Sequence, residues 1–291
     1  MAEGTILSLV REGKPLDHIP VIDFHTHLGA SSRFYYVPYS EPERVVSYMD
    51  RYGVDHAVTF ALSTTTDAQT KNRTVYEAHH RYPERFTPLT TLHALFPQDW
   101  PELIEEGTLA GSRGIKLLAD YQGVDELALD WSPAFDRVRD RGWVVLHHDW
   151  RTPEHLEFYA RNFPGLTFII GHPTLDFADS RLLERLPNVY QCTCAAFVYP
   201  GFARMSIEQM AAVLPSEKIL HGSDALDLDF GTAIGPIAYA DIPERIKERI
   251  LGANALELMR QIRWPIPDQG NRAAGDRFTL GQSKETRNNK R

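Results

Sequence analysis

Short apolar runs alternate with longer stretches of mixed polar and apolar residues along most of the chain. The apolar runs end at Gly, Pro, Asp or His residues and are typical of buried strands, while the longer stretches between them favour helices. The expected strands cover residues 21–27, 56–63, 86–93, 114–119, 144–149, 167–172, 189–196 and 218–224. The expected helices cover 43–52, 70–85, 100–109, 133–141, 153–162, 180–186 and 207–214, with further helices between 243 and 259.

Strict alternation of strand and helix with short connections calls for a parallel sheet. Eight such units favour a closed α/β barrel, the (β/α)8 or TIM barrel, over an open doubly wound sheet. No glycine-rich phosphate turn follows the first strand, which removes the best support for a nucleotide-binding open sheet. We therefore expect one barrel domain over residues 1–264 and a polar tail over 265–291. The tail has too few apolar residues to fold on itself, so we expect it to be flexible or docked on a partner subunit.

Composition narrows the function classes. The net charge of −8 and the lack of a basic stripe argue against nucleic acid as a partner. No apolar run reaches membrane-spanning length, so we expect no membrane association and a cytoplasmic location. A homo-oligomer is compatible with the sequence. Cys192 and Cys194 would share one face of a strand, where a mutual disulfide is strained, so we expect buried free thiols.

Polar residues gather where the predicted strands end, which is where barrel enzymes place their chemistry. In the first strand, alternation puts Asp23, His25 and His27 on one face, and two imidazoles at a strand end can hold one metal ion. A lysine lies in the middle of the fourth strand, where an unpaired ammonium is costly to bury. The full set at these strands is His25, His27, Lys116, His147, His148, His172 and Asp224.

In order along the chain, these motifs resemble those of the amidohydrolase superfamily, and specifically its amidohydrolase-related (amidohydrolase 2) branch, which also contains non-oxidative decarboxylases. The resemblance extends from Val21 to about Met259. One departure is Leu118-Ala119, where related sequences often have a histidine after the leucine. The matching motifs are Ile22-Asp-x-His-x-His27, Gly114-Ile-Lys-Leu117 with Asp120-Tyr-Gln-Gly123, the histidine that closes the fifth strand, Gly171-His172-Pro173, Gly222-Ser-Asp224 and Ile250-Leu-Gly-Ala-Asn254.

The resemblance implies a ligand set and two catalytic residues. It assigns His25, His27, His148 and Asp224 to a divalent metal. His172 is then either a ligand of a second metal or the residue that orients and activates the water, and Asp224 and His172 are the expected catalytic residues. Lys116 occupies the position where some members have a carboxylated lysine that bridges two ions. We expect Zn²⁺, with Mn²⁺ or another first-row ion as alternatives, and one or two ions per chain.

Alternation along the strands does not decide for every side chain whether it belongs to the site. His147 and His148 point to opposite sides of their strand, and only the resemblance selects His148. His221 faces away from Asp224 and is expected to pack against a helix. By position alone, four aromatic residues are candidates for substrate contact: Tyr35, Tyr121, Trp150 and Tyr199.

The leading functional hypothesis is hydrolysis of an amide, ester or lactone bond of a small molecule by a metal-activated water. The alternative is metal-dependent decarboxylation of a small carboxylic acid, including an aromatic one. A third hypothesis, from a different class, is a barrel that binds a ligand without turnover. The ordered set of polar strand ends favours the two enzymes over the third.

Overall fold

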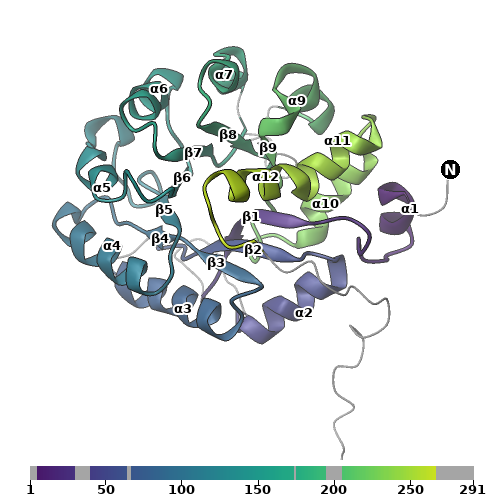
Figure 1. The fold of residues 1–291 in the computed structure, drawn as a ribbon, viewed down its shortest axis with the longest axis horizontal. Coiled ribbons are helices and arrows are strands. Elements are labelled where there is room, and N and C mark those ends of the chain that lie inside the picture. Colours follow the sequence, from purple (N-terminus) through teal and green to yellow (C-terminus); the bar gives the residue numbers. More distant parts are fainter. Residues whose placement is uncertain (1–4, 30–39, 64–66, 174, 195–204, 267–291) are drawn as a thin grey trace, which may run out of the picture.

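The computed structural model describes residues 5–29, 40–63, 67–173, 175–194 and 205–266. Its strands form an inner ring and its helices lie around the outside (Figure 1). The strands are β1 (Ile22–His27), β2 (His56–Phe60), β3 (Phe86–Pro88), β4 (Thr90–Thr91), β5 (Gly114–Leu117), β6 (Val144–His147), β7 (Thr167–Ile170), β8 (Val189–Cys192) and β9 (Ile219–Leu220).

Helices follow the strands along the chain. The α-helices are α1 (Ile6–Arg11), α2 (Pro42–Tyr52), α3 (Ala68–Arg81), α4 (Trp100–Leu109), α5 (Ser132–Asp136), α6 (Pro153–Asn162), α7 (Leu175–Asp179), α8 (Leu182–Arg185), α9 (Ile207–Val213), α10 (Phe230–Tyr239), α11 (Glu244–Glu248) and α12 (Asn254–Gln261). Short 3-10 turns are η1 (Pro97–Asp99), η2 (Glu126–Ala128) and η3 (Ser216–Lys218), and η4 (Arg249–Ala253) is a π-helical segment.

All the strands pair in parallel and in chain order, as β1-β2-β3 and β4 to β9. β3 and β4 are the two halves of the predicted third strand, separated by Leu89, whose amide donates to the carbonyl of Thr59 at 2.8 Å. The ring closes where the amide of Phe24 donates to the carbonyl of His221 at 2.8 Å. The predicted (β/α)8 barrel is confirmed.

Helix boundaries follow local capping chemistry. α6 begins after Thr152, whose hydroxyl accepts from the amide of His155 at 3.2 Å, and Pro153 takes the first helical position. α9 begins with a capping box between Ser206 and Gln209. α1 and α10 were not predicted, since the first is short and the second contains Pro236.

One end of the barrel is sealed by apolar packing. Inside the ring, Ile22, Phe24 and Leu146 belong to a cluster that also includes residues of α12 and Trp264. The Trp264 ring stacks on Phe24 at 6.0 Å between centroids, and its Nε1 donates to the carbonyl of Gly142 at 3.0 Å. α12 lies across the ring in Figure 1 and contributes Ala255, Leu256, Leu258 and Met259 to this apolar cluster.

The helices that the structure describes include none that is both long and apolar enough to cross a membrane. Residues 267–291 lie outside the described residues, so the predicted polar tail stays a prediction.

Candidate metal centre

β1 carries two of the predicted ligands and departs from regular pairing. Its pairing with β2 shifts register between Asp23 and Thr26. Phe24 packs in the interior cluster, and the rings of His25 and His27 both stand edge-on to Phe60, with centroids 5.0 and 4.8 Å away. His25 and His27 therefore lie on the same side of the strand, as alternation predicts, and the register shift is a departure from regular pairing.

His25, His27 and Asp224 converge at this end. Oδ1 of Asp224 lies 2.8 Å from Nε2 of His27 and 3.5 Å from Nε2 of His25. The backbone fixes the approach, because the amide of Asp224 donates to the carbonyl of His25 at 2.9 Å. Burial alone would raise the pKa of Asp224, but the hydrogen bond from His27 and the nearby positive charges bring it below its usual range.

This group fits a divalent ion. One ligand atom from each of the three residues lies within 4.8 Å of the others. Nitrogen and oxygen ligands of Zn²⁺ stand about 2.0–2.2 Å from the ion, so any two of them are at most about 4.4 Å apart. The distances from Oδ1 of Asp224 to Nε2 of His27 and to Nε2 of His25, 2.8 and 3.5 Å, lie within this limit. Burial and the charge of Lys116 lower the pKa of His25 well below its ordinary value, which keeps this imidazole neutral. Neutral imidazoles and an ionised carboxylate are the protonation states that metal binding requires.

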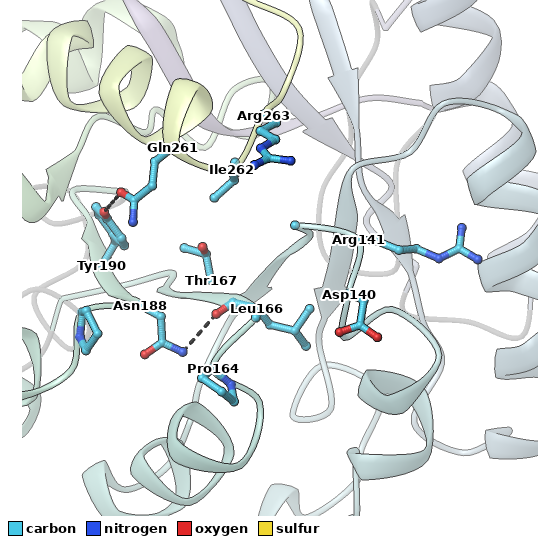
Figure 2. Close-up of a pocket in the computed structure, with 13 residues that line it drawn as sticks. Asp140, Arg141, Pro164, Leu166, Thr167, Asn188, Tyr190, Gln261, Ile262 and Arg263 are labelled. Atoms are coloured by element: carbon cyan, nitrogen blue, oxygen red, sulfur yellow. Dashed lines mark hydrogen bonds between the residues drawn. The ribbon is translucent and has the colours of Figure 1, made fainter.

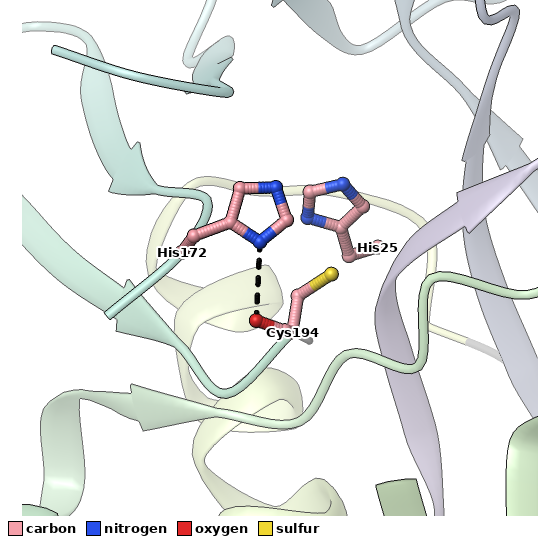
Figure 3. Close-up of side chains that lie close together, drawn as sticks. All are labelled: His25, His172 and Cys194. Atoms are coloured by element: carbon pink, nitrogen blue, oxygen red, sulfur yellow. Dashed lines mark hydrogen bonds between the residues drawn. The ribbon is translucent and has the colours of Figure 1, made fainter. Parts of the chain in front are cut away.

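His172 lies beside His25, with ring centroids 5.1 Å apart. Its Nδ1 is 3.1 Å from the carbonyl oxygen of Cys194 (Figure 3). A carbonyl only accepts, so Nδ1 carries the proton and Nε2 holds the lone pair. His25, His172 and the Cys194 thiol form a second group whose ligand atoms lie within 4.8 Å of one another. Burial, together with the neighbouring His148, lowers the pKa of His172 to about 3, so it is neutral.

His148 stands next to His172, with ring centroids 4.6 Å apart. Its Nδ1 lies 2.7 Å from Oδ2 of Asp120. Although burial opposes it, the hydrogen bond from His148 lowers the pKa of Asp120, and the carboxylate is ionised. An ionised acceptor at Nδ1 fixes the proton there and leaves the Nε2 lone pair for a ligand. The partly exposed ring of Tyr121 packs on His148 at 4.2 Å.

Lys116 is fully buried in the same region. Its Nζ lies 3.2 Å from Nε2 of His25 and 4.3 Å from the centre of the Phe60 ring. Burial lowers the pKa of Lys116 to about 8, against the opposing effects of the Cys194 thiol and Asp224. The amine and a metal ion would compete for the same His25 nitrogen.

A second aspartate, which the sequence analysis did not identify, accompanies Asp224. The Asp227 side chain is 2% exposed, and its Oδ2 lies 3.8 Å from Nε2 of His27. Burial raises the pKa of Asp227 to about 6; the nearby His27 opposes this shift and Asp224 adds to it. Only its position three residues after Asp224 could have pointed to it.

His147 points away from this cluster, as alternation along β6 predicts. Its Nε2 lies 2.7 Å from Glu126, a buried carboxylate that also accepts from Trp131 and His155. Trp150 lies on the same side, 1% exposed, with its ring 4.7 Å from that of His147. Its contacts are those of a packing residue and not of a substrate pocket.

His221 was expected to face away from Asp224 and pack against a helix. It is fully buried and lies 3.9 Å from Asp23, so its charged neighbour is on β1 and not on a helix. Cys192 and Cys194 are free and buried, as predicted. Tyr35 and Tyr199 lie outside the described residues.

A cavity of about 420 Å³ lies elsewhere, where β6, β7 and β8 begin (Figure 2). It is lined by the loops before these strands and by Gln261, Ile262 and Arg263 at the end of α12. Gln261 reaches Tyr190 across it, at 3.4 Å. None of its lining residues belongs to the His and Asp cluster, so it is separate from the candidate centre.

A closed (β/α)8 barrel with histidines and aspartates at the carboxyl ends of its strands is the arrangement of metal-dependent barrel enzymes. A family model described as amidohydrolase matches residues 22–261, and the chain belongs to this family. The resemblance drawn from the motifs is thus confirmed. The family is metal-dependent and includes both hydrolases and decarboxylases. No curated protein matches the chain.

Solved structures share the fold at low identity. An uncharacterised TIM-barrel protein from Bordetella bronchiseptica is 18% identical with a TM-score of 0.67, covering 84% of this chain and 100% of that one. A probable 2-pyrone-4,6-dicarboxylic acid hydrolase from Acinetobacter baumannii, with citric acid bound, is 18% identical (TM-score 0.64; 83% and 100% covered). A 5-carboxyvanillate decarboxylase from Novosphingobium aromaticivorans, complexed with manganese and a nitrobenzoic acid, is 16% identical (TM-score 0.62; 84% and 97% covered).

Proposed function

We propose that the protein is a metal-dependent hydrolase that cleaves an amide, ester or lactone bond of a small molecule. The observation that carries the proposal is the convergence of His25, His27 and Asp224, with a neutral His172 beside them. His25, His27 and Asp224 would hold the ion, with His148 as a further ligand. A bound Zn²⁺ or Mn²⁺ would make water acidic enough to ionise near neutral pH and would polarise the substrate carbonyl.

The chain's own residues supply the proton transfers. Asp224 is ionised at neutral pH, so it can accept a proton from the attacking water and pass it to the leaving group. Such a transfer typically contributes about 10²–10⁴-fold to the rate. His172 is held by its Nδ1 bond to Cys194, which aims the Nε2 lone pair into the site for a hydrogen bond from the same water.

The test is Asp224→Asn in protein whose metal content is measured by elemental analysis. We expect acyl hydrolysis to fall by at least about 10²-fold while metal remains bound, since the amide cannot take the proton. Lactones, esters and amides would be assayed with the ion that the purified protein carries. Protein that carries no transition metal, and gains neither activity nor thermal stability from added Zn²⁺ or Mn²⁺, would contradict the proposal.

Decarboxylation of a small, aromatic carboxylic acid is the second candidate. Tyr121 supports it, because its partly exposed ring lies against His148 and offers a stacking surface for an aromatic acid. Similar solved structures also include decarboxylases of 5-carboxyvanillate and 2,6-dihydroxybenzoate. Release of CO₂ from hydroxybenzoate-type acids, with one metal per chain and no turnover of any acyl substrate, would favour it over hydrolysis.

A further inference from the structure

Asp227 is held in place by the backbone around it. The segment from Asp224 to Leu228 forms a turn in which the amide of Leu228 donates to the carbonyl of Asp224 at 2.9 Å. The same segment is bonded to β1 twice, since the amide of Asp224 donates to His25 and the amide of His27 donates to the carbonyl of Ala225. The position of Asp227 next to His27 is therefore fixed by the same contacts that place the cluster.

The Asp227 carboxylate has no hydrogen-bond donor among the residues that the structure describes. Its side chain is 2% exposed, and neither oxygen accepts a hydrogen bond from that part of the chain. His27 is 3.8 Å away, too far for a hydrogen bond, and its Nε2 is already 2.8 Å from Asp224. Buried carboxylates are normally paired with donors or cations, and one without either points to a missing cation.

The charges of the ligands indicate a divalent ion. Histidine binds a metal as the neutral imidazole, so in the His25, His27 and Asp224 group only Asp224 offsets the charge of a divalent ion. A buried ion is stable only when its charge is compensated locally. Asp224 and Asp227 together supply two negative charges beside the same histidine.

We propose that Asp227 is a further acidic residue of the metal centre and that its charge contributes to the affinity for the divalent ion. The inference rests on the proposed function, because it takes the His25, His27 and Asp224 group as the place where the ion binds. It adds a residue that lies outside the family motifs found in the sequence.

The experiment compares Asp227→Asn and Asp227→Ala with the wild type. Asp229→Asn is the matched control, since it removes the same charge from the same loop, where Asp229 accepts from the amide of Gly231 at 2.8 Å and interacts with Tyr52 away from His27. Metal-free protein is titrated with Zn²⁺ and with Mn²⁺ in competition with a chromophoric chelator. Thermal unfolding is recorded for each variant with and without metal.

Both Asp227 variants should bind each ion about 10–100-fold more weakly than the wild type. The control should bind within twofold of the wild type. Metal-free Asp227→Asn should unfold at a higher temperature than the metal-free wild type, because an uncompensated buried charge is removed. Added metal should also raise the unfolding temperature of Asp227→Asn by less than it raises that of the wild type.

A dissociation constant for Asp227→Asn within twofold of the wild-type value would overturn the inference. The inference would also be overturned if metal-free Asp227→Asn unfolded at a lower temperature than the wild type and bound metal with unchanged affinity. That result would show that Asp227 only supports the loop. Failure of the wild type to bind either ion would instead contradict the proposed function, so the two failures are distinguishable.

Discussion

Nδ1 of His148 lies 2.7 Å from Oδ2 of Asp120, three residues after β5. The ionised carboxylate selects the imidazole tautomer whose Nε2 keeps its lone pair. Such a partner raises the basicity of a ligating histidine and fixes its ring. Asp120 thus orients a predicted ligand without being one itself.

Removing this partner should weaken metal binding. We expect Asp120→Ala to lower the affinity for Zn²⁺ by about 10–100-fold, and Asp120→Asn by less, because the amide oxygen still accepts from Nδ1. Chelator competition on metal-free protein measures both. Asp125→Ala is the control, since Asp125 lies in the same loop but its side chain accepts from the amide of Leu127 and not from His148. Equal affinities for Asp120→Ala and the control would disprove the role.

Glu126 should make the protein sensitive to acid. Burial alone would raise the pKa of Glu126, but His147, His155 and Trp131 outweigh it and lower the pKa from 4.5 to about 2. A group with a lowered folded-state pKa contributes stability above its ordinary pKa and loses it as the pH falls through the folded value. A difference of about 2.5 units corresponds to roughly 3 kcal/mol, lost between about pH 5 and pH 2.

Glu126→Gln tests this directly. The variant should be less stable than the wild type at pH 7, and the difference in free energy of unfolding should shrink as the pH falls toward 2. Urea unfolding at several pH values gives both curves. If the difference in free energy of unfolding stays constant with pH, then His147, His155 and Trp131 do not stabilise the charged form of Glu126.

Trp264 should be a major contributor to stability at the sealed end of the barrel. It is 5% exposed, stacks on Phe24 and donates to Gly142. Trp264→Ala should lower the free energy of unfolding by about 3–5 kcal/mol, through the lost burial and the cavity left behind. Leu109→Ala, at a residue that is 81% exposed, should change it by less than about 0.5 kcal/mol. Denaturant unfolding compares the two.

The barrel and the core of the site could be predicted because both depend on local pattern. α4 and α6 have the predicted bounds, since polar and apolar residues, caps and prolines mark them along the chain. His25, His27 and Asp224 meet because the carboxyl ends of parallel strands lie at one end of a barrel. No sequence pattern predicts the register shift in the pairing of β1 with β2.

Contacts made by loops were harder to predict. Asp120 was visible in a motif, but its partner His148 follows β6, the next strand, and the match depends on how the loop turns after β5. The contact between Glu126 and His147 also joins a loop to a strand, since Glu126 lies in η2 after β5 and His147 ends β6. Apart from its position three residues after Asp224, Asp227 had no signal in the sequence, because its burial depends on the turn that follows Asp224.

The tail is predicted to be dispensable for catalysis. Residues 270–291 are polar and basic and lack periodic apolar positions, so they cannot form a core of their own. A chain ending at residue 269 should retain kcat within about twofold and keep its unfolding temperature. Size-exclusion chromatography of both forms shows whether the tail holds subunits together. A large loss of kcat would make the tail part of the active site.

The last prediction concerns Lys116 and the number of ions. Its Nζ lies 3.2 Å from Nε2 of His25, and its pKa of about 8 makes the neutral amine more available at neutral pH than that of an exposed lysine. A neutral amine is the form that reacts with CO₂ to give a carboxylated lysine, and that group could bridge two ions. If it does so here, Lys116→Ala should reduce the metal content from about two ions per chain to one or fewer and abolish activity.

Lys116 has a different role if the protein holds one ion. A wild type that holds one ion, kept by Lys116→Ala, would exclude the bridge and leave Lys116 as a donor to His25. In that case Lys116→Met, which keeps most of the side-chain volume over Phe60 but removes the competing donor, should bind Zn²⁺ more tightly than the wild type. Elemental analysis with chelator competition separates the two roles, because bridging predicts a loss of metal from Lys116→Met and competition predicts a gain in affinity.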